Sequence, residues 1–106
     1  MDVHRTLGGG FLEKVYENAM AVALRDLGIV HVQQATINVF FRGELFGVNM
    51  ADLLVVGCAI VELKTVDRIT DVHRAQAMNY LKATGLKLAI IINFASTNLE
   101  WERIVM

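Results

Sequence analysis

The chain has 106 residues, of which 55% are hydrophobic and 20% charged, and ten basic against eleven acidic residues give a formal net charge of −1. The length predicts one domain over residues 1–106 with a sizeable buried core, whereas the composition excludes a disordered chain and the charge balance excludes a general basic coat for nucleic acid. The longest apolar run, Leu53–Val61, is far shorter than the about 20 residues of a membrane helix, and no secretion signal is visible, so we expect a cytoplasmic domain with no membrane partner.

Helical patterns occupy the first quarter of the chain. Residues 2–7 are interpreted as the stub of a helix, and a glycine turn follows at 8–10. Apolar side chains then recur at helical spacing over 11–27, with Gly28 directly after them as a C-cap. We therefore predict one amphipathic helix over 11–27.

Strand patterns follow in the middle of the chain. The predicted strands cover 32–41, 45–56 and 59–65. Their turns are expected at Arg42–Glu44 and at Gly57–Cys58, and the single cysteine, Cys58, is interpreted as a small buried hydrophobe. Because the apolar runs are nearly continuous, we expect these strands to be covered on both faces.

A helix and two strands complete the prediction. Asp71 is the expected N-cap of a helix that ends near Thr84, and strands follow at 87–94 and 101–105. A helix between two strands is typical of a crossover between parallel neighbours. The expected fold class is therefore α/β or α+β, with a mixed central sheet flanked by helices.

Three charged residues interrupt the apolar strands. Glu62 and Lys64 are two apart on one predicted strand, so they share a face. Asp52 lies on the preceding strand and opposes Glu62 only if the turn between them has odd length or a bulge, whereas a two-residue turn would place Asp52 on the other face. Gly57 is compatible with the odd turn but does not prove it.

Two carboxylates brought together in that register would suit a hard divalent cation, Mg²⁺ or Mn²⁺. Such an ion activates water and neutralises phosphoryl charge, and a neighbouring lysine stabilises the charge that develops. From spacing alone, a structural salt bridge that includes Asp52, Glu62 or Lys64 is the alternative interpretation.

The order Asp52, then Glu62-Leu63-Lys64, resembles the D…ExK signature of the PD-(D/E)xK nuclease superfamily. More specifically, the chain resembles its GxxExxY family, because residues 10–16 read Gly-Phe-Leu-Glu-Lys-Val-Tyr. Further residues of that family's pattern follow in the expected order over nearly the whole chain, at Gln34, Gly43, 51–55, 60–64, Gln76, 79–85 and 92–94. The resemblance implies a restriction-endonuclease-like core.

The resemblance also implies roles at matching positions. Asp52 and Glu62 would be metal ligands together with the carbonyl of Leu63, and Lys64 would be the catalytic lysine. Glu13 would be an accessory carboxylate that faces the metal, whereas without the resemblance the preferred explanation is a first-turn glutamate favoured by the helix dipole. Catalytic Gln76 and substrate-binding Tyr80 resemble the QxxxY helix of recombination-type nucleases.

Three further residues are candidates for substrate binding. Tyr16 shares a helix face with Glu13, and His73 lies on one helix face with Gln76 and Tyr80. A solvated helix edge with a surface histidine is the alternative for that face. Arg74 belongs to a modest local excess of basic residues, with five basic and two acidic residues over 64–87, which suits contacts to a nucleic-acid backbone.

Taken together, these observations predict a Mg²⁺- or Mn²⁺-dependent nuclease that hydrolyses nucleic-acid phosphodiester bonds, with DNA favoured over RNA as partner. A homodimer that spans a duplex is a further expectation. The alternatives are a non-catalytic module that binds nucleic acid or protein with the nuclease fold retained, and an ion-pair cluster that only stabilises the fold.

Overall fold

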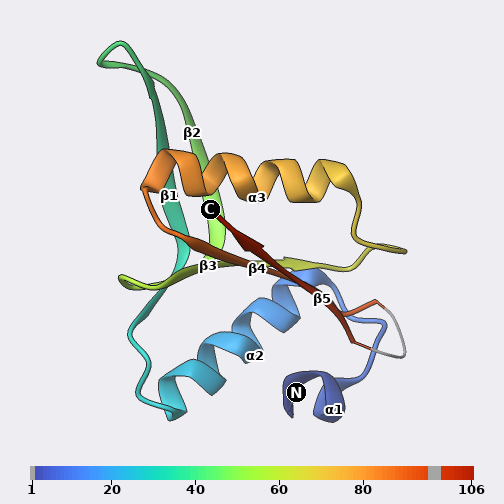
Figure 1. The fold of residues 1–106 in the computed structure, drawn as a ribbon. Coiled ribbons are helices and arrows are strands. Elements are labelled where there is room, and N and C mark those ends of the chain that lie inside the picture. The colour runs from blue at the N-terminus through green and yellow to red at the C-terminus, as the bar shows by residue number, and fades with distance from the viewer. Residues whose placement is uncertain (1, 96–98) are drawn as a thin grey trace.

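Five strands form one sheet in the computed structural model of the chain, which describes residues 2–95 and 99–106 (Figure 1). The elements in chain order are α1 (Asp2–Leu7), α2 (Glu13–Asp26), β1 (His31–Phe41), β2 (Glu44–Val55), β3 (Ala59–Lys64), α3 (Asp71–Thr84), β4 (Leu88–Asn93) and β5 (Glu100–Val105). The strands lie side by side in the order of the sequence.

The sheet is mixed because one of its connections is a crossover. β1, β2 and β3 form an antiparallel meander, β3 and β4 pair in parallel on either side of α3, and β5 returns antiparallel to β4. α3 lies on one side of the sheet, and α1 and α2 lie on the other (Figure 1). The predicted mixed sheet flanked by helices is confirmed.

Two buried clusters form the core, one on each face of the sheet. Ala77 and Leu81 of α3 pack with Ile60 and Ile91 on one face. The opposite face holds a second cluster, in which Tyr16 of α2 packs with Leu53, Leu63, Ile92 and Phe94 among others. Neighbouring residues of β3 thus serve opposite layers, which explains why this strand is apolar at successive positions.

The expected coverage on both faces holds for β3 but is wrong for the distal half of the β1–β2 hairpin. β3 and β4 are largely buried, whereas β1 beyond Ile37 and most of β2 before Ala51 are exposed. A 14-residue helix is about 21 Å long, whereas strands of 11–12 residues extend roughly 36–40 Å. The hairpin therefore projects past α3 (Figure 1).

Local details correct three further expectations. Cys58 is exposed rather than buried, because it lies in the turn between β2 and β3. α2 begins at Glu13 rather than at residue 11, since Leu12 is still extended. The N-cap of α3 is Thr70 rather than Asp71: the Thr70 backbone N–H donates to Nδ1 of His73 at 3.0 Å in a capping box.

Among the described residues, no helix is long and apolar enough to span a membrane.

Candidate active site

Asp52 and Glu62 come together where β2 separates from β3. The ladder between these strands pairs Val55 with Ala59 and Leu53 with Val61, and it ends there. The turn therefore contains the three residues 56–58, with Gly57 at its centre in the left-handed region at φ +71°. This odd length is the condition for opposing Asp52 and Glu62, and the structure meets it.

Each acid is held by the backbone of the opposite strand. The Asp52 N–H donates to Oε1 of Glu62 at 3.2 Å, and the Leu63 N–H donates to Oδ2 of Asp52 at 2.8 Å. Carboxylates thus take up backbone N–H groups just beyond the end of the regular ladder. The N–H and C=O of a strand residue point to the same side, so the carbonyl of Leu63 also faces β2 and Asp52.

Glu62 is buried with few compensating charges. The residue is 5% exposed, and among residues 2–95 and 99–106 its ion-pair partner is the Nζ of Lys64, 3.9 Å from Oε2. Burial raises the pKa of Glu62 to about 7, and the charge of Asp52 adds to this rise, while the Asp52 N–H and Lys64 oppose it. A positive charge placed between these two acids would offset both the burial of Glu62 and its repulsion by Asp52.

Asp52 and Glu13 share the same electrostatic neighbourhood. Burial raises the pKa of Asp52, against the hydrogen bond from Leu63, and the charge of Glu17 raises it further. The pKa of Glu13, at the start of α2, also lies above its ordinary value, because burial and the charge of Asp52 raise it more than the charge of Lys64 lowers it. The structure therefore brings Glu13, Asp52, Glu62 and Lys64 into one region, from three different elements.

A second layer behind Asp52 is a feature that the sequence reasoning missed. Glu17 is 3% exposed and accepts hydrogen bonds from Gln34 Nε2 at 2.5 Å, Gln33 Nε2 at 2.7 Å and Lys14 Nζ at 2.8 Å. Burial raises the pKa of Glu17, but these hydrogen bonds outweigh it, so the pKa lies below its usual range. The network keeps Glu17 ionised next to the candidate ligands.

Gln34 connects this layer to Asp52. It is a non-glycine residue with a left-handed φ of +49°, and the β1–β2 ladder skips it between the Gln33–Leu53 and Ala35–Ala51 pairs. Its side chain also lowers the pKa of Asp52 by hydrogen bonding. The available signal was the pair of adjacent glutamines near the start of β1, together with Glu17 one turn after Glu13 on α2.

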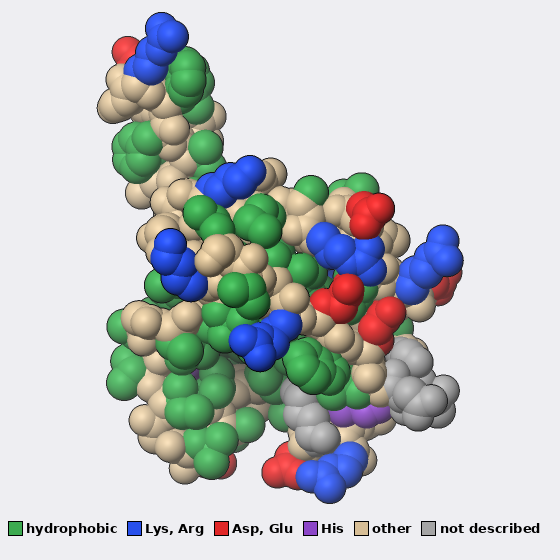
Figure 2. All heavy atoms as spheres, in the orientation of Figure 1, with side chains coloured by type: hydrophobic (Ala, Val, Ile, Leu, Met, Phe, Trp, Pro, Cys, Tyr) green, Lys and Arg blue, Asp and Glu red, His purple; other side chains and the backbone are tan. Residues whose placement is uncertain are grey.

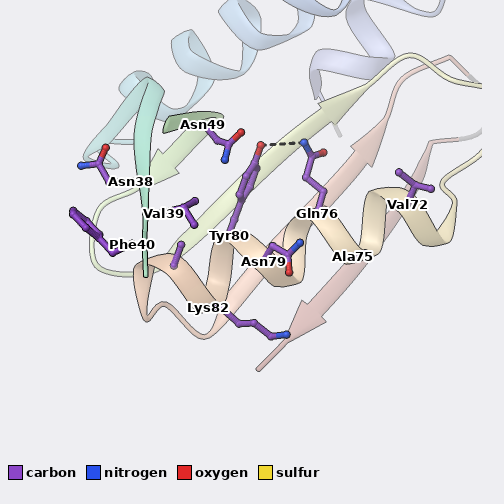
Figure 3. A pocket seen from close by; sticks show the side chains of 11 residues that line it. Asn38, Val39, Phe40, Asn49, Val72, Ala75, Gln76, Asn79, Tyr80 and Lys82 are labelled. Atoms are coloured by element: carbon purple, nitrogen blue, oxygen red, sulfur yellow. Dashed lines mark hydrogen bonds between the residues drawn. The ribbon is translucent and has the colours of Figure 1, made fainter. Parts of the chain in front are cut away.

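Gln76 and Tyr80 belong to α3, and Tyr80 points from this helix towards Asn49 of β2 (Figure 3). Gln76 Nε2 donates to the Tyr80 hydroxyl at 3.0 Å (Figure 3). Burial raises the pKa of Tyr80, and the charge of Glu62 raises it further, so this ring lies within electrostatic reach of the acids. The hydrogen bond of Gln76 thus goes to Tyr80, whereas a contact between Gln76 and Lys64 stays a prediction.

The other candidates for substrate binding have structural partners. Tyr16 is fully buried, stacks on Phe94 with ring centroids 4.4 Å apart, and donates its hydroxyl proton to the Gly8 carbonyl at 2.6 Å. His73 caps α3, and Arg74 Nε lies 2.9 Å from Oε2 of Glu102. Their roles in substrate binding stay predictions that these placements do not support.

The donor set is compatible with a small hard cation. Within the described ranges 2–95 and 99–106, no three His, Cys, Asp or Glu side chains gather as a ligand group. Asp52, Glu62 and the Leu63 carbonyl nevertheless supply three oxygen donors along the edge of β3 that faces β2. Mg²⁺ commonly binds proteins through one or two carboxylates and keeps several waters. The buried like charges of the two acids fit such an ion.

Comparison with known proteins agrees with this geometry. Residues 1–104 match the family model described as the PD-(D/E)XK nuclease superfamily. No curated protein matches the chain in sequence.

Two solved structures share the fold. The first is the crystal structure of SSO0001, with a TM-score of 0.65 and 13% sequence identity. The matched region covers 87% of this chain and 48% of the SSO0001 chain. The second is an alkaline exonuclease (LHK-Exo) from Laribacter hongkongensis, with a TM-score of 0.61 and 14% sequence identity. The matched region covers 87% of this chain and 55% of the exonuclease chain. The chain thus spans about half the length of each.

Proposed function

The chain belongs to the PD-(D/E)XK nuclease superfamily, and we propose that it is a metal-dependent nuclease of the GxxExxY type that hydrolyses phosphodiester bonds, with DNA favoured over RNA. The observation that carries the proposal is the pair of acids beyond the end of the β2–β3 ladder, each held by the opposite backbone, with Lys64 beside them. A cytoplasmic location and a homodimer remain predictions.

The chain's own groups supply most of the parts that hydrolysis needs. Asp52, Glu62 and the Leu63 carbonyl would hold Mg²⁺ or Mn²⁺, which when bound supplies Lewis-acid activation of water and charge neutralisation at the phosphate. The Lys64 ammonium, with its side chain 17% exposed, would orient the attacking water or stabilise the charge that develops on the phosphoryl oxygens.

Two further residues adjust this machinery. Glu13 adds negative charge near Asp52 and so tunes the affinity for the ion. Gln76 would position the substrate or Lys64 from α3. Both act at the periphery, so their removal should reduce the rate of cleavage less than removal of Lys64 or Glu62.

The test is cleavage of labelled DNA and RNA, as single strands and duplexes, with Mg²⁺ or Mn²⁺. We expect Lys64→Ala and Glu62→Ala to lower the rate by about 100-fold or more, as is typical when a group that stabilises transition-state charge is removed. Lys87→Ala is the matched control, because Lys87 is exposed and lies outside the site. Circular dichroism spectra verify that the variants fold.

Other outcomes identify the alternatives. Cleavage that is unchanged in Lys64→Ala and Glu62→Ala contradicts the proposal. Metal-independent binding without cleavage favours the non-catalytic module. A loss of stability in Asp52→Asn, without any metal effect on the wild-type protein, favours the structural ion-pair cluster.

A further inference from the structure

A groove of about 850 Å³ lies between the projecting hairpin and α3 (Figure 3). Asn38, Val39 and Asn49 line it from the hairpin, and Gln76, Asn79 and Lys82 line it from α3. Its volume is within the range of about 300–1,000 Å³ that is usual for small-ligand sites. The groove exists because the strands of the hairpin are longer than the helix beside them.

The polar side chains of the groove are mainly neutral carboxamides. In the part of the chain that the structure describes, the side chains of Asn38, Asn49 and Asn79 make no hydrogen bond to other protein groups. Each amide offers both a donor and an acceptor. Such groups form paired hydrogen bonds with the edges of nucleobases, which also carry donors and acceptors side by side.

The charge of the groove does not suit a dense run of phosphates. Lys82 is the single charged residue among the described lining residues. In Figure 2, Lys and Arg side chains are scattered over the visible face rather than gathered into a stripe. Duplex recognition through the backbone needs several cations along the path, whereas apolar Val39 and Ala75 suit the faces of unstacked bases.

The groove shares two residues of α3 with the candidate active site. Gln76 and Tyr80 line it, and Tyr80 lies within electrostatic reach of Glu62. In Figure 3, Val39 and Asn49 point from the hairpin towards Tyr80. A strand that lies in the groove would therefore continue towards the two acids.

We propose that this groove binds unpaired bases of a single-stranded nucleic acid, whose backbone then reaches the site at Asp52 and Glu62. This inference rests on the proposed function, because it takes the bound strand to be the substrate of the nuclease. It names the strand form: a single strand or an unwound end is preferred over a closed duplex.

The test distinguishes binding through bases from binding through phosphates. Fluorescence anisotropy in metal-free buffer compares a labelled oligodeoxythymidine with an abasic strand of the same length and charge. We expect the base-bearing strand to bind roughly tenfold tighter, the gain usual for a paired amide–base contact. Asn49→Ala should remove most of that difference, and Lys82→Ala should weaken both strands alike, because it removes a contact to phosphate.

Asn18→Ala is the control, since Asn18 is an exposed asparagine on α2, across the sheet from α3. It should leave both affinities unchanged. The inference is overturned if the abasic strand binds as tightly as the base-bearing strand, if neither strand binds, or if Asn49→Ala and the double variant Asn49→Ala/Asn79→Ala keep the full difference.

A cleavage assay with Mg²⁺ distinguishes this inference from the proposed function. Base-dependent binding without any cleavage supports the groove and contradicts the nuclease proposal. Cleavage that depends on Lys64 but is equal for base-bearing and abasic strands supports the nuclease proposal and overturns the groove.

Discussion

Glu62 is a buried acid whose ion-pair partner, Lys64, is 3.9 Å away, and the carboxylate of Asp52 lies beside it. A residue in such a position lowers the stability of the metal-free protein whenever it is ionised. A bound divalent cation would offset this loss of stability, which explains why an acid can occupy the position. Stability and function are thus opposed at this residue.

The raised pKa of Glu62 predicts an unusual pH dependence of stability. Between its ordinary pKa of 4.5 and about 7, the folded protein keeps a proton that the unfolded chain has lost. The free energy of unfolding should therefore fall as the pH rises through this window, by up to about 3 kcal/mol from this group. Urea unfolding in EDTA on both sides of the window measures it.

Glu62→Gln should remove that decline, because the amide has no proton to lose, and exposed Glu44→Gln should retain it. Added Mn²⁺ should stabilise the wild-type protein above pH 7 and should not stabilise Glu62→Gln. A decline of the same size in Glu62→Gln and the wild-type protein would contradict this origin.

Gln34 is a residue whose backbone and side chain have opposite requirements. Its φ of +49° favours glycine, yet its amide is needed for the hydrogen bond to Glu17. We predict that Gln34→Ala is less stable than Gln34→Gly by about 1 kcal/mol, because both lose the amide and only alanine keeps the left-handed penalty. Thermal unfolding of the two variants measures the difference.

The neighbouring Gln33 provides a control with the opposite sign. Its φ is not positive, so Gln33→Gly should be less stable than Gln33→Ala. If glycine is the less stable variant at both positions, the left-handed strain at Gln34 has no energetic consequence.

At the scale of elements, Asn93 joins the end of β4 to two other segments. It is fully buried, accepts hydrogen bonds from the N–H groups of Val66 at 3.1 Å and Ala95 at 3.2 Å, and donates to the Val66 carbonyl at 2.7 Å and to Glu100 Oε1 at 3.0 Å. The loop that follows Lys64 is thereby fixed to β4 and β5. The end of β3, and hence the site, depends on this side chain.

Asn93→Asp should therefore be strongly destabilising. The change replaces a donor by a carboxylate that faces the Val66 carbonyl and Glu100, so we expect a loss of about 3 kcal/mol or more in the free energy of unfolding. Asn18→Asp is the control, because exposed Asn18 serves Gln33 as an acceptor through Oδ1 and keeps that capacity. A loss below 1 kcal/mol in Asn93→Asp would refute the role of its donor.

At the scale of the whole molecule, the hairpin extends out of the packed body. Beyond Ile37 its side chains are exposed, including Phe40, Phe41 and Phe46. β3 and β4 lie at the centre of the sheet under both helical layers. Local stability should follow this division, because burial and packing set the free energy of local opening.

Hydrogen exchange should reveal two levels of protection. We expect the amides of 39–48 to exchange far faster than those of 59–64 and 88–93 in the free protein. A single-stranded oligonucleotide should slow the exchange of the hairpin if the groove binds it. Equal protection of the hairpin and the central strands in the free protein contradicts the division.

The sequence alone determined the elements and the position of the acids. Apolar periodicity located the helices and strands, since each pattern depends on residues close in the chain. The opposition of Asp52 and Glu62 depended on the length of one turn around Gly57, and both alternatives could be stated in advance. The superfamily followed from Asp52, Glu62 and Lys64 with the ordered motifs around them, and the family-model match confirmed it.

Other features were decided by tertiary structure, because they depend on which distant surfaces meet. The bond between Gln34 and Glu17 joins residues 17 apart in sequence, and no local pattern predicts it. The cap of α3 depends on the rotamer of His73, and the exposure of the hairpin depends on the length of α3 relative to β1 and β2. The groove follows from that mismatch, so it exists only in the folded molecule.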